Sequence, residues 1–300
     1  MKFPLKIFTY FALAFAFCAG ARGGDLNKTA SALLAEELSG EVAFLADSAC
    51  FGREYGTGGA TGAAFYIFRQ FEAAGYSVDF QTFSSGGRLG RNVVARTPGK
   101  FSQYIVVGAY FDGLGVIDGV RYPGADTNAS GVSGMLALAR HFAGGGFPDG
   151  QTGLIFVAFD GHGNDLAGSR HFAAHCGYKI ALMVNLDTIG SDSEPVVRQR
   201  RAYMLALGGK RYAEALEWAN RTVGLHLSYD YYGNKGFTDL FYLRTSDQKW
   251  FLESGIPCVM FTSGVTMNTN KPSDLPSTLD YDLMVKRLRV IAGWLQPMLR

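Results

Sequence analysis

The chain has 300 residues, of which 48% are hydrophobic, and its formal net charge is +2 at pH 7. This length and hydrophobic content suit one large α/β domain with a well-buried core. A net charge so close to zero gives no support for a nucleic acid or an acidic polymer as the partner.

The amino-terminal segment has the pattern of a secretory signal. Lys2 and Lys6 come before the apolar run IFTYFALAFAFCAGA, which ends in small residues. We predict cleavage after Ala21, so that residues 1–21 are a signal peptide and residues 22–300 form a single exported domain, periplasmic or extracellular. A membrane-spanning helix needs about 18 apolar residues or more, and this run is shorter, so no stable membrane span is expected.

Cysteine usage fits an oxidising compartment. Cys50, Cys176 and Cys258 remain after the predicted cleavage, which permits one disulfide. Cys50 and Cys176 are the better candidates for it, whereas Cys258 lies in an apolar run and is expected in the core. A lipid anchor on Cys18 is disfavoured by the bulky Phe17 before it. The absence of Cys-x-x-Cys spacing argues against a thiolate zinc site.

Helical and strand patterns alternate along the chain. An amphipathic helix is predicted over residues 29–46, and a glycine-rich turn, GTGGATG, leads into a second helix that ends at Gly75. Short apolar runs predict buried strands at YIVVGA, GLIFVAF, ALMVNL, AYMLAL and IPCVMF. Helices are predicted between and after them at 131–143, 210–223, 247–254 and 280–299. This alternation indicates a three-layer α/β/α fold with a mostly parallel central sheet.

Polar residues follow the predicted strands. They are Tyr110 and Asp112 after YIVVGA, Asp126 and Asn128 in YPGADTNASG, Asp160 and His162 after GLIFVAF, and Asp187 after ALMVNL. Because the carboxyl ends of parallel strands open on one edge of a sheet, we expect these side chains to meet there and form a ligand crevice.

Several stretches resemble the co-catalytic zinc aminopeptidases of peptidase clan MH, of the aminopeptidase Y and bacterial leucyl aminopeptidase type. They are LADSACFGREYGTGG, GADTNASGVSGMLALAR, FVAFDG with LAGSRHF, NLDTIG, and KPSDLPSTLDYDLM. The resemblance covers most of the chain after residue 21 and implies two zinc ions bridged by an aspartate, with a glutamate as the general base. Carried over, the bridging ligand is Asp126 and a second carboxylate ligand is Asp187.

The remaining positions of the zinc site differ from the family pattern. The family has a histidine where this chain has Tyr110, a Glu-Glu pair where it has His162-Gly163, and a last histidine where it has Asn270. The general base and three of the five protein ligands are therefore missing. The single-zinc glutaminyl cyclases of the same fold would also need ligands at Gly163 and Asn270.

Other residues could take over part of these roles. His162 stands at the general-base position, where it acts either as a metal ligand or base or as a polar loop residue that fills the space. Asp112, which in the family orients a zinc-bound imidazole, would be left beside other carboxylates that repel it. His162, Lys271 or Arg170 could supply a replacement charge, and Lys271 is the favoured candidate. Gln248, in Ser-Asp-Gln, replaces a further histidine of the family pocket.

Two other patterns receive structural interpretations. His171 and His175 in HFAAH have the spacing of a helical metal site but no accompanying glutamate, so we expect structural roles. No serine follows a strand in a Gly-x-Ser-x-Gly pattern, so nucleophilic catalysis is not indicated.

Three functions remain open from the sequence. The favoured one is a degenerate pseudo-peptidase without zinc that binds a peptide or a protein partner, with Tyr110, Asp112, Asn270, Lys271 and Gln248 in its pocket. The second is an active zinc aminopeptidase with substituted ligands, and the third is a hydrolase that holds a hard cation on Asp126, Asp187 and Asn270. Aromatic stretches such as YDYYGNKGF fit either a peptide pocket or core packing.

Overall fold

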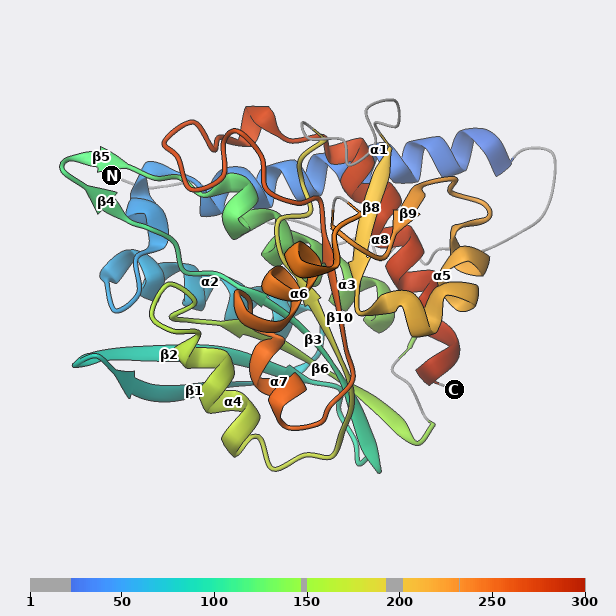
Figure 1. The fold of residues 1–300 in the computed structure, drawn as a ribbon, viewed down its shortest axis with the longest axis horizontal. Coiled ribbons are helices and arrows are strands. Elements are labelled where there is room, and N and C mark those ends of the chain that lie inside the picture. The colour runs from blue at the N-terminus through green and yellow to red at the C-terminus, as the bar shows by residue number, and fades with distance from the viewer. Residues whose placement is uncertain (1–22, 147–149, 193–201, 232, 300) are drawn as a thin grey trace, which may run out of the picture.

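An eight-stranded sheet lies at the centre of the computed structural model, which describes residues 23–146, 150–192, 202–231 and 233–299 (Figure 1). The strand order is β1-β2-β6-β3-β7-β10-β8-β9. Strands β6, β3, β7 and β10 run parallel, as do β8 and β9, whereas β1–β2, β2–β6 and β10–β8 are antiparallel pairs. The strands are β1 (Ser77–Ser85), β2 (Arg88–Arg96), β3 (Gln103–Tyr110), β6 (Thr152–Phe159), β7 (Ile180–Leu186), β8 (Tyr203–Leu207), β9 (His226–Ser228) and β10 (Cys258–Thr262).

Helices cover both faces of this sheet (Figure 1). The helices on one face are α1 (Gly23–Leu45), α2 (Gly58–Ala73), α3 (Ser130–Gly144), α5 (Ala213–Asn220) and α8 (Tyr281–Leu295). Those on the other face are α4 (Ala167–His175), α6 (Lys235–Arg244) and α7 (Lys249–Glu253). Short helical turns occupy Ser48–Arg53, Ala125–Ala129, Gly209–Tyr212, Pro276–Thr278 and Gln296–Leu299, and a small ribbon pairs β4 (Val116–Ile117) with β5 (Val120–Arg121).

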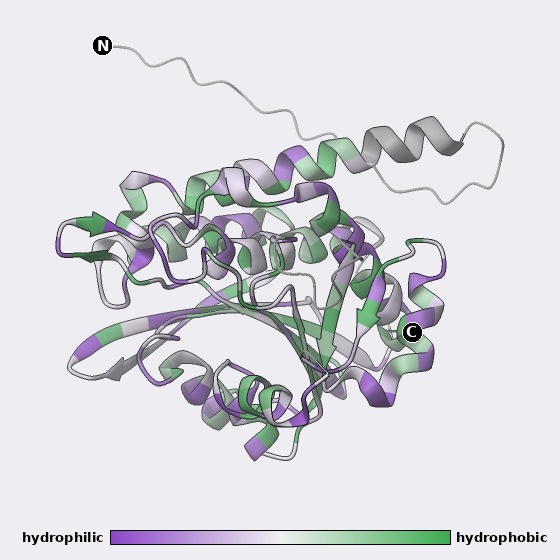
Figure 2. Cartoon of the chain, turned by 45° about the horizontal axis from the view of Figure 1, so that its top comes forward, coloured by the Kyte–Doolittle hydropathy of each residue, from purple (hydrophilic) through white to green (hydrophobic). Residues whose placement is uncertain are grey.

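The predicted three-layer architecture with a mostly parallel sheet is confirmed. Each of the five apolar runs forms a strand, and β6 is buried along its whole length. Such continuous burial is what helices on both faces of a parallel sheet require. Hydrophobic residues run along the strands inside the molecule, while hydrophilic residues gather on the outer helices and loops (Figure 2).

The glycine-rich segment differs from its prediction, because α2 begins inside it at Gly58. The Thr57 side chain accepts a hydrogen bond from the Ala60 backbone N–H and so caps the helix. A Cβ atom at Gly59 would lie 2.1 Å from the carbonyl oxygen of Cys50. Glycine is therefore needed at position 59 because the start of α2 packs closely against the backbone of Cys50, and not because the chain turns there.

The predicted Cys50–Cys176 disulfide is wrong, since both thiols are free in the structure. Cys50 lies in the helical turn that packs under α1 and α2, whereas Cys176 ends α4 on the opposite face of the sheet. The sheet stands between them. Cys258 is buried in β10, as predicted.

The predicted signal peptide, residues 1–21, lies outside the described residues, and so does Cys18. Within the described ranges, every helix is too short or too polar to cross a lipid bilayer.

Candidate functional site

The polar side chains at the carboxyl edge of the sheet surround a cleft of about 280 Å³. Tyr110 ends β3 and Asp112 follows it, while His162 comes after β6 and Asp187 after β7. These strands are parallel neighbours, so their carboxyl ends meet at one edge. Of the residues singled out from the sequence, the cleft is lined by Tyr110, Asp112, His162, Gly163, Asp187, Asn270 and Lys271.

His162 occupies the middle of this site. Its ring stacks on Tyr110, with the ring centroids 3.6 Å apart and an interplanar angle of 16°. Its Nδ1 lies 2.9 Å from Oδ2 of Asp247, a carboxylate that is fully buried. The backbone N–H groups of His162 and Gly163 both donate to the Asp112 carboxylate, at 2.8 and 3.2 Å. The loop after β6 is thus held from both sides.

Charge fixes the protonation state of His162. Burial alone would lower the pKa of the imidazole, but Asp247, Asp187 and Asp112 raise it to about 9. At neutral pH the ring is therefore an imidazolium that donates its Nδ1 proton to Asp247. An imidazolium has no lone pair with which to ligate a metal or accept a proton.

Asp187 is held by hydrogen bonds from its neighbours. The buried Ser246 hydroxyl donates to Asp187 Oδ2 at 2.6 Å, and Asn185 Nδ2 donates to that hydroxyl at 2.8 Å. Burial raises the pKa of Asp187, and the charge of His162 and the hydrogen bonds from Ser246 and Tyr110 lower it in part. Burial and the nearby Asp187 carboxylate raise the pKa of Tyr110 well above 10, so this residue stays a neutral phenol. Gln248 lies behind the cleft, where its Oε1 accepts a hydrogen bond from Asn185 at 2.7 Å.

Asp126 is buried and does not line the cleft, although the next residue, Thr127, does. Its Oδ1 accepts hydrogen bonds from the Ser130 hydroxyl at 2.9 Å and from the Gly190 N–H at 2.8 Å, whereas its buried Oδ2 has no hydrogen-bond partner among the described residues. Burial and the Asp274 carboxylate raise the pKa of Asp126 to about 6. The Asp274 side chain in turn accepts the backbone N–H of Asp126 at 2.7 Å.

The rim of the cleft carries Asn270 and Lys271, both exposed to solvent. In the described part of the chain no ion pair joins Lys271 to Asp112, Asp126 or Asp187. Arg170, the other candidate for the replacement charge, pairs with the exposed Asp165 instead. Of the three candidates, it is His162 whose charge interacts with Asp187 and Asp112.

Two functional features were missed from the sequence. Asp247 stands between two residues that were noted, Ser246 and Gln248, yet nothing local indicated that it would meet His162, 85 positions away. The second is Arg53, a fully buried guanidinium that donates to the carbonyl oxygens of Phe111, at 2.8 Å, and of Gly124, also at 2.8 Å. It fixes the segments that carry Asp112 and Asp126.

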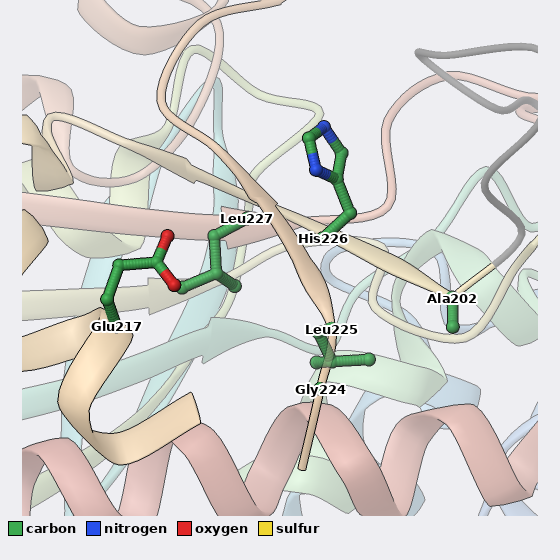
Figure 3. A pocket seen from close by; sticks show the side chains of 6 residues that line it. All are labelled: Ala202, Glu217, Gly224, Leu225, His226 and Leu227. Atoms are coloured by element: carbon green, nitrogen blue, oxygen red, sulfur yellow. The ribbon is translucent and has the colours of Figure 1, made fainter. Parts of the chain in front are cut away.

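A second hollow, of about 620 Å³, is formed next to α5 and β9 and shares no lining residue with the cleft (Figure 3). It is lined by Ala202, Glu217, Gly224, Leu225, His226 and Leu227. His226 and Glu217 come from different elements and their polar ends are separate (Figure 3). The described residues that line this hollow include no set of catalytic groups.

The donor set does not fit the two-zinc site that the resemblance implies. Gly163 has no side chain, Tyr110 remains a phenol, and the imidazolium of His162 faces the carboxylates. No group of three or more His, Cys, Asp or Glu side chains arranged to hold a metal ion occurs among the described residues. The unpartnered Oδ2 of Asp126 is the feature that a bound cation would explain.

Comparisons with known proteins agree with this architecture. The sequence model of peptidase family M28 matches residues 92–295. The chain is 34% identical over 142 residues to "Uncharacterized protein YfbL" of Escherichia coli, covering 44% of this chain and 43% of that protein. It is 27% identical over 170 residues to "Leupeptin-inactivating enzyme 1" of Streptomyces exfoliatus, covering 52% and 37%. The matches thus span less than half the length of these curated relatives.

Solved structures share the fold at low sequence identity. A zinc aminopeptidase from Bacillus subtilis superposes with a TM-score of 0.70 at 14% identity, over 88% of this chain and 94% of that one. A glutaminyl cyclase from Fimbriiglobus ruber gives a TM-score of 0.72 at 22% identity, over 87% and 94%. The resemblance to zinc aminopeptidases and glutaminyl cyclases is confirmed at the level of fold.

Proposed function

Because the chain belongs to peptidase family M28, we propose that it is a catalytically degenerate member of the family that binds a peptide or a protein partner in its cleft. The observation that carries the proposal is the His162–Asp247 pair, 2.9 Å apart at the general-base position. The surrounding carboxylates raise the pKa of this imidazole to about 9, so at neutral pH a role as base or zinc ligand would first require the loss of a proton.

The wider arrangement supports the same function. The positive charge that zinc ions would supply comes from a side chain instead, and one Asp187 carboxylate oxygen already accepts a hydrogen bond from Ser246. The wall of the cleft remains suited to a peptide. It combines aromatic and apolar side chains, Tyr122, Tyr231, Phe241, Met260 and Val265, with polar groups on its floor. Relatives of this fold named aminopeptidases point to a ligand of the peptide class.

A second candidate, an active zinc aminopeptidase with substituted ligands, is favoured by the unpartnered Oδ2 of Asp126. Zinc content and hydrolysis separate the two. After equilibration with excess zinc and desalting, we expect the wild type to retain no more zinc than an Asp126→Asn variant. Hydrolysis of aminoacyl anilides should not exceed that of His162→Gln. About two zinc ions per chain, lost in Asp126→Asn, would establish the second candidate.

Peptide binding is tested separately, with a pool of short dye-labelled peptides that have free amino termini. We expect binding that is weakened about tenfold or more by Thr245→Trp, because Thr245 is exposed and lines the cleft. The matched control is Leu240→Trp on α6, the helix that ends just before Thr245, since Leu240 is also exposed but does not line the cleft. Equal binding to both variants, or no binding to the wild type, would contradict a peptide cleft.

A further inference from the structure

Strand β1 forms one edge of the central sheet and has a neighbouring strand on one side only (Figure 1). Its nine residues pair with β2 in a single antiparallel register. In the described part of the chain, the main chain of β1 exchanges hydrogen bonds with that of β2 alone. The Tyr55 hydroxyl donates to the carbonyl oxygen of Ser85, at the turn end of the strand. Along the rest of β1, the N–H and C=O groups that point away from β2 are available to another strand.

This edge lacks the features by which sheet edges commonly avoid pairing with another chain. β1 contains no proline and no lysine, and its register with β2 has no bulge. Its one charged residue, Asp79, forms an ion pair with Arg96 of β2 at 2.9 Å. The opposite edge of the sheet is protected by its shortness, because β9 has only three residues. Of the two edges, β1 is therefore the one suited to the addition of a strand.

Aromatic side chains of α2 flank this edge on one face of the sheet. Phe80 of β1 packs against Phe65 and Phe68, with ring centroids 5.1 and 4.8 Å apart. Phe65 is nevertheless 50% exposed, and Phe80 is only partly buried. A strand added beside β1 would bring its own side chains against these two rings and remove more of their apolar surface from water.

We propose that two copies of this chain pair through β1, antiparallel across a two-fold axis, so that their sheets join into one. The sequence of β1 suits one register, in which Phe80 lies opposite Phe80 of the second copy. Val78 then lies opposite Thr82, and Asp79 opposite Gln81. This register pairs an aromatic ring with an aromatic ring and a carboxylate with an amide, and no like charges meet. A register centred one residue earlier would place the two Asp79 carboxylates opposite each other.

The partner is a second copy because the edge is complementary to itself in this register. A two-fold contact uses the same strand on both copies, so the assembly closes at two chains. It also covers both open edges at once, whereas a foreign strand would need its own matching pattern. β1 shares no residue with the lining of the cleft, so the pairing is independent of the proposed function.

Sedimentation velocity over a concentration series tests the pairing, with the tag-free chain that lacks residues 1–21. We expect a monomer–dimer equilibrium with a Kd of about 10 µM or tighter. Thr82→Lys places a charge on the edge, and Phe65→Glu places one on the flanking helix. Each should raise the Kd about tenfold or more, and both residues are exposed, so the monomer should still fold. The matched control is Leu89→Lys, an exposed residue of β2 in the same hairpin, which should leave the Kd unchanged.

Hydrogen exchange followed by mass spectrometry locates the contact. The β1 amides of the wild type should exchange more slowly at high protein concentration than at low concentration, and those of Thr82→Lys should not show this difference. Three outcomes overturn the proposal. They are a wild type that stays monomeric throughout the series, a dimer that is unaffected by both Thr82→Lys and Phe65→Glu, and an equal weakening by Leu89→Lys. Peptide binding in the cleft is measured separately, so failure of either proposal leaves the other standing.

Discussion

Replacing Asp247 with alanine is expected to lower the free energy of unfolding by about 3 kcal/mol at pH 6. Asp247 is fully buried, and the side chain of its partner His162 is only 21% exposed. Without the carboxylate, the folded protein must either keep an imidazolium with no partner or neutralise it. We expect a value at the lower end of the range known for breaking a buried ion pair, about 3 to 5 kcal/mol, because solvent reaches part of the His162 ring.

The loss of stability in Asp247→Ala should decrease as the pH rises, because of the pKa of His162. That pKa is about 9 in the folded chain against about 6.5 in an unfolded one. The stabilisation by charge is therefore complete below about pH 6.5 and is lost as the pH rises through about 9. At pH 9.5 we expect a deficit of only about 1 kcal/mol, the contribution of the remaining hydrogen bond. Urea unfolding of wild type and Asp247→Ala at pH 6, 7.5 and 9.5 measures this difference in the free energy of unfolding.

Two further variants show how much of the stability loss in Asp247→Ala comes from the lost charge. Asp247→Asn keeps an acceptor of the same shape without the charge, so its deficit should lie between those of wild type and Asp247→Ala. Glu72→Ala breaks the exposed pair with Arg69 and should leave stability nearly unchanged. Equal stability of Asp247→Ala and wild type at pH 6, or a deficit that grows with pH, would show that the pair is not charged.

The fold was largely predictable because the central strands are long, apolar and buried on both faces. The hairpin β1–β2 was missed because its strands are partly exposed and mix polar with apolar residues. Its turn, Gly86-Gly87, has positive φ at both positions, which is a recognisable hairpin signal between two such strands. Helix α6 was missed because none of its residues is buried, so its sequence has no clear apolar face. Cys50 and Cys176 were favoured as a pair only because Cys258 was expected in the core, and that reasoning carries no information about the two faces of a sheet.

The sequence predicted which residues surround the cleft, but it did not predict which cation lies beside the carboxylates. Strand ends placed Tyr110, Asp112, His162 and Asp187 around one cleft, as parallel topology requires. Which cation compensates the carboxylates depends on a contact between the loop after β6 and the segment before α7. Sequence position favoured Lys271, beside a lost ligand, but that side chain is exposed on the rim.

On the proposed function, the contacts around His162 take the place of the metal that the family pattern implies. Zinc ions would hold several carboxylates close together, and their removal leaves repulsion that must be compensated. Here one imidazolium, stacked on Tyr110 and bonded to Asp247, lies among those carboxylates. On the same proposal, these contacts oppose the binding of a metal ion, because the ion would meet the imidazolium at short range.

Restoring the missing ligands should therefore restore zinc binding, provided that His162 is replaced at the same time. The double variant Tyr110→His/His162→Glu offers an imidazole beside Asp126 and Asp187 and removes the competing charge. Three protein ligands suffice for one zinc ion, so we expect about one zinc per chain after desalting, against none for the wild type. Tyr110→His alone should retain less zinc than the double variant, since His162 remains protonated beside the site.

Adding Gly163→Glu and Asn270→His should raise the content to about two zinc ions per chain. The backbone accepts both changes. A Cβ atom at Gly163 would lie 3.9 Å from Asp112 Oδ2, an ordinary contact. Asn270 has a φ of 58°, a left-handed conformation in which histidine is also found. Asp126→Asn in this background is the control, because it removes the one carboxylate that both ions share. If the folded four-substitution variant still binds no zinc, the loss of the metal lies in the surrounding network of Ser246 and Asn185 rather than in the ligands themselves.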